Sequence, residues 1–230
     1  MNKISIIIPV LNEEEFIGDL LSHIATVSVT LNIEDIVVVD GGSTDKTKEI
    51  VATFKDVKLL NSDKGRAKQM NTGAKNSNGS ILYFLHADAL PPKNFDALIL
   101  KEVSRGNSAG CFRMQFDSNH WWLRLASWLT QFNWRPCRGG DQSQFITRAL
   151  FDEVGGFDEN FIIYEDNILI NELYKRNEFV VINKKIKTSA RQYKKVGIWK
   201  LQYYFWSIYV QRWFGASADD IYAYYKNNVR

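Results

Sequence analysis

Three apolar strand patterns in the N-terminal half of the chain each lead into an acidic residue. The runs SIIIPV, IVVVD and ILYFLHAD end at or shortly before Glu13, Asp40 and Asp88. In an open α/β sheet, ligands bind in the crevice beyond the carboxyl ends of the strands. Ionised carboxylates accept hydrogen bonds, so they suit a ligand that carries hydroxyl or N–H groups. We therefore expect these acids to face one ligand site.

A further acid pair, Glu165 and Asp166, opens the amphipathic helical pattern EDNILINELYKR in the second half of the chain. Acids in the first turn of a helix stabilise its macrodipole by some tenths of a kcal/mol. Taken alone, the pair is therefore best interpreted as helix capping.

Strand and helix patterns alternate along the first half of the chain and must position these residues. The expected strands cover residues 3–10, 34–40, 57–61 and 80–86, and the expected helices cover residues 13–28, 45–54 and 65–76. Such βαβ units predict an α/β fold with a mainly parallel, Rossmann-like sheet flanked by helices, which explains the nearly continuous apolar strands. Asn12, and either Ser43 or Thr44, are expected to cap the helices that follow them.

The composition is that of a globular protein and excludes several classes. The chain has 230 residues, of which 45% are hydrophobic and 24% charged, and the net charge of +3 gives no indication of nucleic-acid binding. Cys111 and Cys137 have no metal-type spacing, so reduced thiols in a cytoplasmic protein are expected. We expect neither a secretory signal nor a membrane span, and the protein is predicted to be soluble or peripheral on the inner face of the membrane.

Five motifs, in order, resemble the bacterial-type family 2 glycosyltransferases of the GT-A fold. They are IIPVLNEEE, VVDGGSTDKT, GRAKQMNTGA, FLHADALPP and YEDNILINEL. The resemblance covers most of residues 3–190 and implies a GT-A domain over residues 1–195, followed by a helical extension over residues 196–230. It also implies an inverting enzyme that moves a sugar from a nucleotide-diphosphate sugar to an acceptor hydroxyl.

The resemblance assigns several residues to the donor. Glu13 and Asp40 match positions that hold the nucleoside, in a segment that includes Pro9 and Asn12, and Arg66 and Arg191 fall near the diphosphate. A guanidinium can bind two phosphate oxygens at once. Both acids could instead cap helices, and Arg66 could be a solvated surface arginine.

The segment His86-Ala87-Asp88 occupies the place of the family's Asp-x-Asp motif. The resemblance implies that Asp88 binds a divalent cation, Mn²⁺ or Mg²⁺, that bridges the donor phosphates. Because His86 replaces a carboxylate, Mn²⁺ is the favoured ion. His86 could instead contact the ribose or neighbouring side chains.

The resemblance also assigns a base and a sugar-binding loop. Asp166 matches the general base that takes the proton of the acceptor hydroxyl, with Glu165 beside it. Gly140, Asp141 and Gln142 fall in the loop that lines the donor sugar and acceptor. An ordinary exposed turn is the alternative interpretation of that loop.

The tryptophans fall in two segments, and those of the second are spaced by seven residues. Trp199, Trp206 and Trp213 share a predicted helix stripe with Tyr203 and Val210. Packing against the domain or a second subunit is the favoured interpretation, which leaves a homodimer open. The alternative is a helix on a membrane surface, which would suit a lipid-linked acceptor.

Two other functions compete with a glycosyltransferase. A nucleotidyltransferase could share the sheet and the metal-binding aspartate, but its first strand would be followed by a glycine-rich loop with an arginine, whereas this chain has PVLNEEE. A non-catalytic nucleotide-sugar-binding module would not depend on Asp166.

Overall fold

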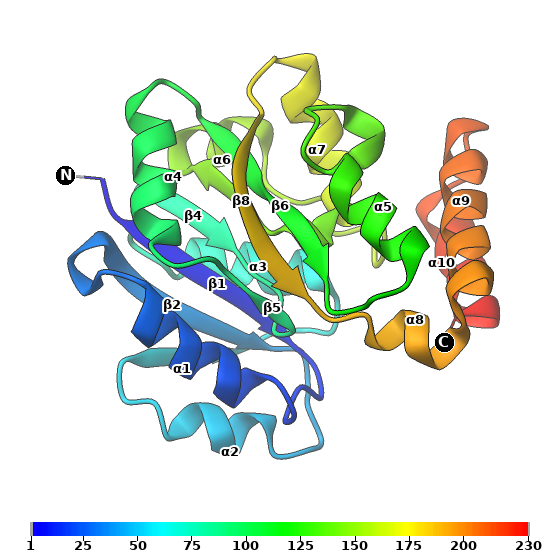
Figure 1. Ribbon diagram of the computed structural model, residues 1–230. Coiled ribbons are helices and arrows are strands. Elements are labelled where there is room, and N and C mark those ends of the chain that lie inside the picture. Colours follow the sequence, from blue (N-terminus) through cyan, green and yellow to red (C-terminus); the bar gives the residue numbers. More distant parts are fainter. Residues whose placement is uncertain (1, 230) are drawn as a thin grey trace.

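A single eight-stranded sheet forms the centre of the computed structural model, which describes residues 2–229 (Figure 1). In chain order the strands are β1 (Ile4–Val10), β2 (Ile33–Asp40), β3 (Val57–Asn61), β4 (Ile81–Phe84), β5 (Ala89–Leu90), β6 (Ala109–Phe116), β7 (Gln144–Thr147) and β8 (Val180–Thr188). The α-helices are α1 (Ile17–Val27), α2 (Thr47–Ala52), α3 (Arg66–Lys75), α4 (Phe95–Ser104), α5 (Trp121–Leu129), α6 (Arg148–Val154), α7 (Glu165–Lys175), α8 (Arg191–Val196), α9 (Ile198–Trp213) and α10 (Ala218–Asn228). The order of strands across the sheet is β3-β2-β1-β4-β7-β6-β8-β5.

The N-terminal half forms the parallel part of the sheet. Strands β3, β2, β1 and β4 pair in parallel, and every residue of β1 is buried. Helices α1, α2 and α4 contribute to the core on one face, and α3, α6 and α7 contribute to the core on the other. The predicted parallel sheet is confirmed, because covering both faces requires the apolar strands seen in the sequence.

The second half of the sheet mixes strand directions. β7 lies antiparallel between β4 and β6, and the short β5 pairs antiparallel with β8, while β6 and β8 are parallel. The sheet as a whole is therefore mostly, but not entirely, parallel. Because β4 ends at Phe84, the segment from Leu85 to Asp88 leaves the sheet where β1 and β2 also end.

The predicted helix caps at Asn12 and at Ser43 or Thr44 are wrong. Helix α1 starts at Ile17, later than expected, and neither α1 nor α2 has a side-chain cap. Asn12 has a left-handed backbone (φ 56°), and its Oδ1 accepts a hydrogen bond from the Thr44 N–H at 2.8 Å. The Asn12 N–H donates to Ser43 Oγ at 2.9 Å. These side chains therefore join the β1–α1 and β2–α2 loops to each other.

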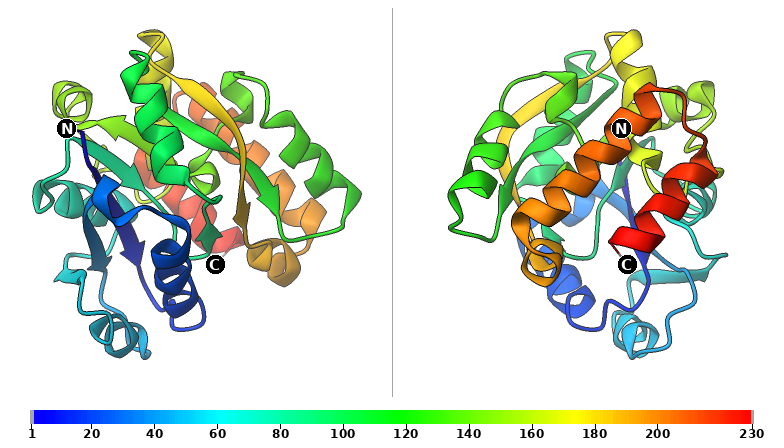
Figure 2. Two further views of the ribbon diagram at one scale, coloured as in Figure 1. Left: turned by 60° about the vertical axis from the view of Figure 1, so that its left-hand side comes forward. Right: turned by 90° about the vertical axis from the view of Figure 1, so that its right-hand side faces the viewer.

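The C-terminal helices pack on the domain next to the start of α7. Ile208 of α9 and Ile221 of α10 form a buried cluster with Phe161, and α9 and α10 lie side by side in Figure 2. The tryptophan stripe of α9 does not form this packing surface, since Trp199, Trp206 and Trp213 keep about half or more of their surface exposed. Within residues 2–229, no helix combines the length and the apolar character that a bilayer span requires.

Candidate active site

Two of the strand-end acids fix their loops, Asp40 through its carboxylate and Glu13 through its backbone N–H. Both carboxylate oxygens of Asp40 accept hydrogen bonds from the Ser43 N–H, and one also accepts from the Gly42 N–H at 3.0 Å. Asp40 is only 1% exposed. The Glu13 N–H donates to Thr47 Oγ1 at 2.8 Å, which fixes the start of the β1–α1 loop against α2. The loop geometry therefore leaves the Glu13 side chain free to turn toward the crevice.

Arg191, the first residue of α8, brings two strand ends together. Its Nη1 and Nη2 donate to the carboxylate oxygens of Glu13 at 2.7 and 2.6 Å, and its Nε lies 3.2 Å from Asp88 Oδ2. The guanidinium also lies 4.7 Å from the ring centroid of Phe16. Glu13 and Asp88, far apart in the sequence, therefore both contact Arg191 at the edge of the sheet, whereas the third predicted acid, Asp40, is buried against its own loop. The roles of these acids in donor binding stay predictions.

A second arginine faces the acid pair of α7. Arg66 Nη1 lies 3.4 Å from Glu165 Oε1 and 3.9 Å from Asp166 Oδ2. Glu165 is 1% exposed, and its burial raises its pKa while Arg66 lowers it. Desolvation, and then the charge of Glu165, raise the pKa of Asp166 to about 7. An aspartate with this pKa can change protonation state near neutral pH, as a general base must.

Gly140 marks the point where the two parts of the site meet. A Cβ atom at this position would lie 2.0 Å from Asp166 Oδ2 and 3.3 Å from His86 Nε2. The strand-end segment and the acid pair are therefore in close proximity. Burial, followed by the charges of Arg66 and Arg191, lowers the pKa of His86 to about 3, so its imidazole is neutral at pH 7.

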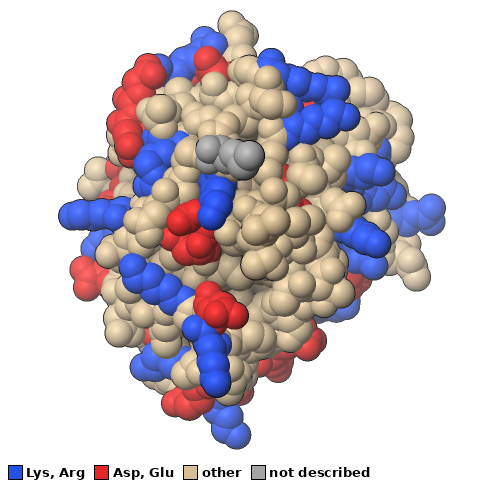
Figure 3. Space-filling model, turned by 90° about the vertical axis from the view of Figure 1, so that its left-hand side faces the viewer, with Lys and Arg blue, Asp and Glu red and all other residues tan. Residues whose placement is uncertain are grey.

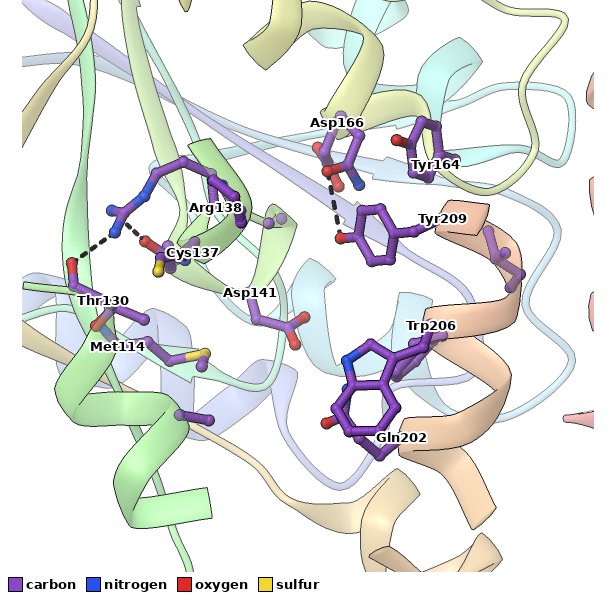
Figure 4. A pocket seen from close by; sticks show the side chains of 18 of the residues that line it. Met114, Thr130, Cys137, Arg138, Asp141, Tyr164, Asp166, Gln202, Trp206 and Tyr209 are labelled. Atoms are coloured by element: carbon purple, nitrogen blue, oxygen red, sulfur yellow. Dashed lines mark hydrogen bonds between the residues drawn. The ribbon is translucent and has the colours of Figure 1, made fainter. Parts of the chain in front are cut away.

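Asp141 adds a third acid beside Asp88 and Asp166. Its carboxylate points into a cavity (Figure 4), and solvent reaches the side chain through the opening of that cavity. The predicted role of Gly140, Asp141 and Gln142 in lining the donor sugar and acceptor stays a prediction.

The cavity has a volume of about 820 Å³ and extends from Asp166 toward α9. Aromatic side chains from separate elements form much of its wall: Phe116, Trp122, Tyr164, Tyr193, Phe205, Trp206, Tyr209 and Tyr225. The Tyr209 hydroxyl donates to Asn167 Oδ1 at 3.3 Å, next to Asp166 (Figure 4). These aromatic residues are not predicted from the sequence as part of the site, and the clustering of tryptophans in two segments is the one available signal.

Five predicted donor-binding residues are buried: Asp40 and Glu165, described above, and Pro9, Ala87 and Gln142. Pro9 is buried within β1, and Ala87 belongs to the core and is 4% exposed. Gln142 donates to the Cys137 carbonyl at 2.6 Å and accepts from Arg138 Nη1 at 2.7 Å. Any contact of Pro9 or Ala87 with a donor must therefore run through the backbone, and their role in donor binding stays a prediction.

Arg138 is a residue of the site region that the sequence analysis missed. It is 2% exposed, and its Nη2 donates to the carbonyls of Thr130 and Phe132 at 2.7 and 2.8 Å. It therefore fixes the loop that carries Gly140 and Asp141. An arginine beside two glycines was the only sequence signal for this role.

The residues of the site fit a divalent cation only if the donor supplies further ligands. Among the described residues there is no group of three or more His, Cys, Asp or Glu side chains placed to hold a metal ion. Asp88 offers one carboxylate, and neutral His86 lies in the same segment. Mg²⁺ in phosphate-transfer sites is commonly bound by one or two carboxylates together with substrate phosphates, so a single carboxylate is compatible with a metal–diphosphate complex.

Known structures with the same arrangement of elements include TarS of S. aureus. Residues 1–349 of TarS in complex with UDP give a TM-score of 0.66 at 20% identity, covering 82% of this chain and 60% of that chain. The complex of the same TarS fragment with UDP-GlcNAc gives 0.63 at 21% identity, covering 81% of this chain and 58% of that chain. This similarity shows that the fold is of the GT-A type.

Similar sequences are glycosyltransferases, and the chain spans about a third to a half of their length. A dolichyl N-acetyl-alpha-D-glucosaminyl phosphate 3-beta-D-2,3-diacetamido-2,3-dideoxy-beta-D-glucuronosyltransferase of Methanococcus voltae is 33% identical over 102 residues, covering 41% of this chain and 32% of that protein. The probable glycosyltransferase YdaM of Bacillus subtilis is 24% identical over 203 residues, covering 73% of this chain and 46% of that protein. The sequence model of glycosyl transferase family 2 matches residues 5–158, more than half of the chain. The chain therefore belongs to glycosyl transferase family 2.

Proposed function

We propose that this chain is an inverting glycosyltransferase that uses a nucleotide-diphosphate sugar and in which Asp166 is the general base. The observation that carries the proposal is the convergence at Gly140, where Asp166 and His86 approach the same point. Through His86 and Asp88, this point adjoins the strand-end acids held by Arg191. The TarS complexes with UDP and UDP-GlcNAc support a nucleotide-sugar donor in a fold of this type.

In the proposed reaction, Asp166 accepts the proton of the acceptor hydroxyl as the hydroxyl oxygen attacks the anomeric carbon. The attack comes from the face opposite the departing nucleoside diphosphate, so a single displacement inverts that carbon. The raised pKa of Asp166 makes it a stronger base than an aspartate in water, whose pKa is about 3.9. The aromatic cavity beside Asp166 is the proposed binding site of the acceptor.

The charge of the diphosphate would be balanced by both arginines. Arg66 and Arg191 are each half-buried and close to acids, and each has guanidinium N–H groups that can bind phosphate oxygens. Asp88 is the proposed ligand of a divalent cation, which would supply further neutralisation of the leaving group. Because Arg191 contacts Asp88 directly, donor binding is expected to draw Arg191 toward the phosphates and release this carboxylate.

The test combines donor screening with one substitution. UDP-, GDP- and dTDP-sugars are screened by thermal shift with Mn²⁺, Mg²⁺ or a chelator, since a ligand far above its dissociation constant raises stability by a few kcal/mol. The Asp166→Asn variant is expected to retain donor binding and to lose transfer about 100-fold to 10,000-fold, the usual contribution of a general base. Asp56→Asn, at an exposed position in the α2–β3 loop, is the matched control.

Retention of full transfer by Asp166→Asn would exclude the proposed base. If the wild type and Asp166→Asn both bind the donor but neither shows transfer to any acceptor, the result would instead favour a non-catalytic binding module. A nucleotidyltransferase is already disfavoured by the match to family 2 over residues 5–158.

A further inference from the structure

Helices α5 and α9 form a continuous aromatic surface, here named the α5–α9 face. Its exposed apolar residues are Trp121, Leu125, Trp128, Trp134, Trp199, Tyr203, Trp206, Val210, Trp213 and Phe214. The ring centroids of Trp121 and Trp199 lie 5.7 Å apart, so the two helices meet through their tryptophans. Trp213 and Phe214 are 87% and 85% exposed. An apolar patch of this extent on a soluble protein indicates an interaction site.

The two helices of the face carry basic residues and no acids. Helices α5 and α9 contain Arg124, Lys200 and Arg212 and no Asp or Glu, although the whole chain has 29 basic and 26 acidic residues, and Lys195 of α8 lies three residues before α9. The opposite side of the molecule, by contrast, carries both signs intermixed (Figure 3). The partner of the α5–α9 face is therefore expected to be anionic.

An anionic lipid surface fits both properties of the face. Tryptophan and tyrosine prefer the interface between water and lipid, and Lys and Arg side chains extend their charges to the headgroups. A second copy of the chain fits less well, since two copies of this face would bring like charges together. We propose that the α5–α9 face binds the surface of an anionic bilayer.

This surface adjoins the cavity that contains Asp166. Trp122 of α5 and Trp206 of α9 both line the cavity, and their rings contact each other with centroids 5.8 Å apart. Binding at the α5–α9 face therefore places the cavity close to the lipid headgroups. An acceptor carried by a lipid would reach Asp166 over a short distance, a consequence that rests on the proposed function.

The proposal is tested by flotation of the full chain with vesicles of phosphatidylcholine, with and without phosphatidylglycerol. The protein is expected to float with the anionic vesicles at low salt and to remain at the bottom with the neutral ones. Lys195→Gln combined with Lys200→Gln removes two exposed charges and is expected to weaken binding about 25-fold, which corresponds to about 1 kcal/mol for each basic residue. Trp213→Ser combined with Phe214→Ser is expected to weaken binding at least as much.

Matched control variants lie on other surfaces. Leu31→Ser removes an apolar side chain that is 82% exposed, in the α1–β2 connection on the side away from α9 (Figure 1). Lys55→Gln combined with Lys101→Gln removes two exposed charges outside the face. Both control variants are expected to float like the wild type.

Three results would overturn the proposal. The first is a wild-type protein that stays at the bottom with anionic vesicles, and the second is an equal loss of flotation in the control variants. The third is a dimer, detected by sedimentation, that Trp213→Ser with Phe214→Ser dissociates, because the face would then be a protein interface. Flotation requires no turnover, and Asp166→Asn is expected to float like the wild type. A failure of membrane binding is therefore distinguishable from a failure of the proposed glycosyltransferase activity.

Discussion

Replacing Gly140 by alanine tests the position of Asp166 without changing its chemistry. The added Cβ would lie 2.0 Å from Asp166 Oδ2 and 2.7 Å from its Cγ. Non-bonded carbon atoms approach to about 3.5 Å, so the carboxylate must move by more than about an ångström. The cavity beside Asp166 offers room for this movement, and we therefore expect the variant to fold.

The expected loss is in turnover rather than in donor binding. Misplacement of a reacting group by about 1 Å can cost about 100-fold in rate, so transfer by Gly140→Ala is expected to fall by about that factor. The new methyl group does not displace Glu13 and Asp88 at the strand ends, nor Arg191, which contacts both of them. Donor affinity is therefore expected to stay close to the wild-type value.

The assay is release of nucleoside diphosphate from the donor found in the thermal-shift screen, with donor affinity measured separately by calorimetry. Gly139→Ala is the matched control, because Gly139 has extended backbone (φ −169°, ψ 168°) and no described atom lies within 4 Å of its added Cβ. Full activity of Gly140→Ala would refute the argument that the position of Asp166 limits transfer. Equal losses in both variants would show that the loop, and not the carboxylate, is responsible.

Three other changes have defined outcomes. Because desolvation raises the pKa of Asp166 to about 7, transfer should increase as pH rises through about 7. The protonated Asp166 contributes stability that is full below about pH 4 and is lost as pH rises through about 7. In Asp166→Asn, the rate of transfer and the stability in urea unfolding should both lose this dependence on pH. Arg191→Ala removes a guanidinium that can bind two phosphate oxygens, so the affinity for nucleoside diphosphate, measured by calorimetry, should fall about 10-fold to 100-fold. Arg191→Lys should restore little of this affinity. An unchanged affinity in Arg191→Ala would place the diphosphate elsewhere. Arg138→Met removes charged donors from Gln142 Oε1 and from the Thr130 and Phe132 carbonyls, and only weaker or neutral donors, Cys111 Sγ to Gln142 and the Trp134 N–H to Phe132, remain for two of them. The variant should lose about 3 kcal/mol in urea unfolding, whereas a loss below about 1 kcal/mol would show that the loop does not depend on Arg138.

The parallel half of the sheet could be predicted from the sequence because burial on both faces leaves a strong pattern. The predicted strand at residues 57–61 matches β3, and those at residues 3–10 and 34–40 differ from β1 and β2 by one residue. Gly73, in the GRAKQMNTGA motif, packs closely on β1, since an added Cβ would lie 2.4 Å from Ile7 Cγ2. Local apolar pattern and glycine placement are properties of short segments, so one sequence is enough to read them.

The parts of the site that depend on contacts between distant segments could not be predicted in detail. Nothing local indicates that Arg191 reaches Glu13, 178 residues away. A cap at Asn12 is reasonable for an isolated helix, but Asn12 Oδ1 accepts its hydrogen bond from the Thr44 N–H on a neighbouring loop instead of from a helix N–H. The antiparallel β7 was also missed, since its four residues lie in a loop-like segment and pair only through tertiary contacts.

The arrangement of charges explains why a site with so many acids is stable before the donor binds. Arg66 holds Glu165 and Asp166, and Arg191 holds Glu13 and Asp88, so each guanidinium offsets the repulsion and desolvation of an acid pair.

A nucleotide diphosphate brings negative charge of its own and would compete with these acids for both guanidinium groups. Asp88 would then lose the positive charge of Arg191 beside it, unless a metal ion took the place of that guanidinium. Donor and metal are therefore expected to bind cooperatively, each strengthening the other, because either one alone leaves uncompensated charge in the site.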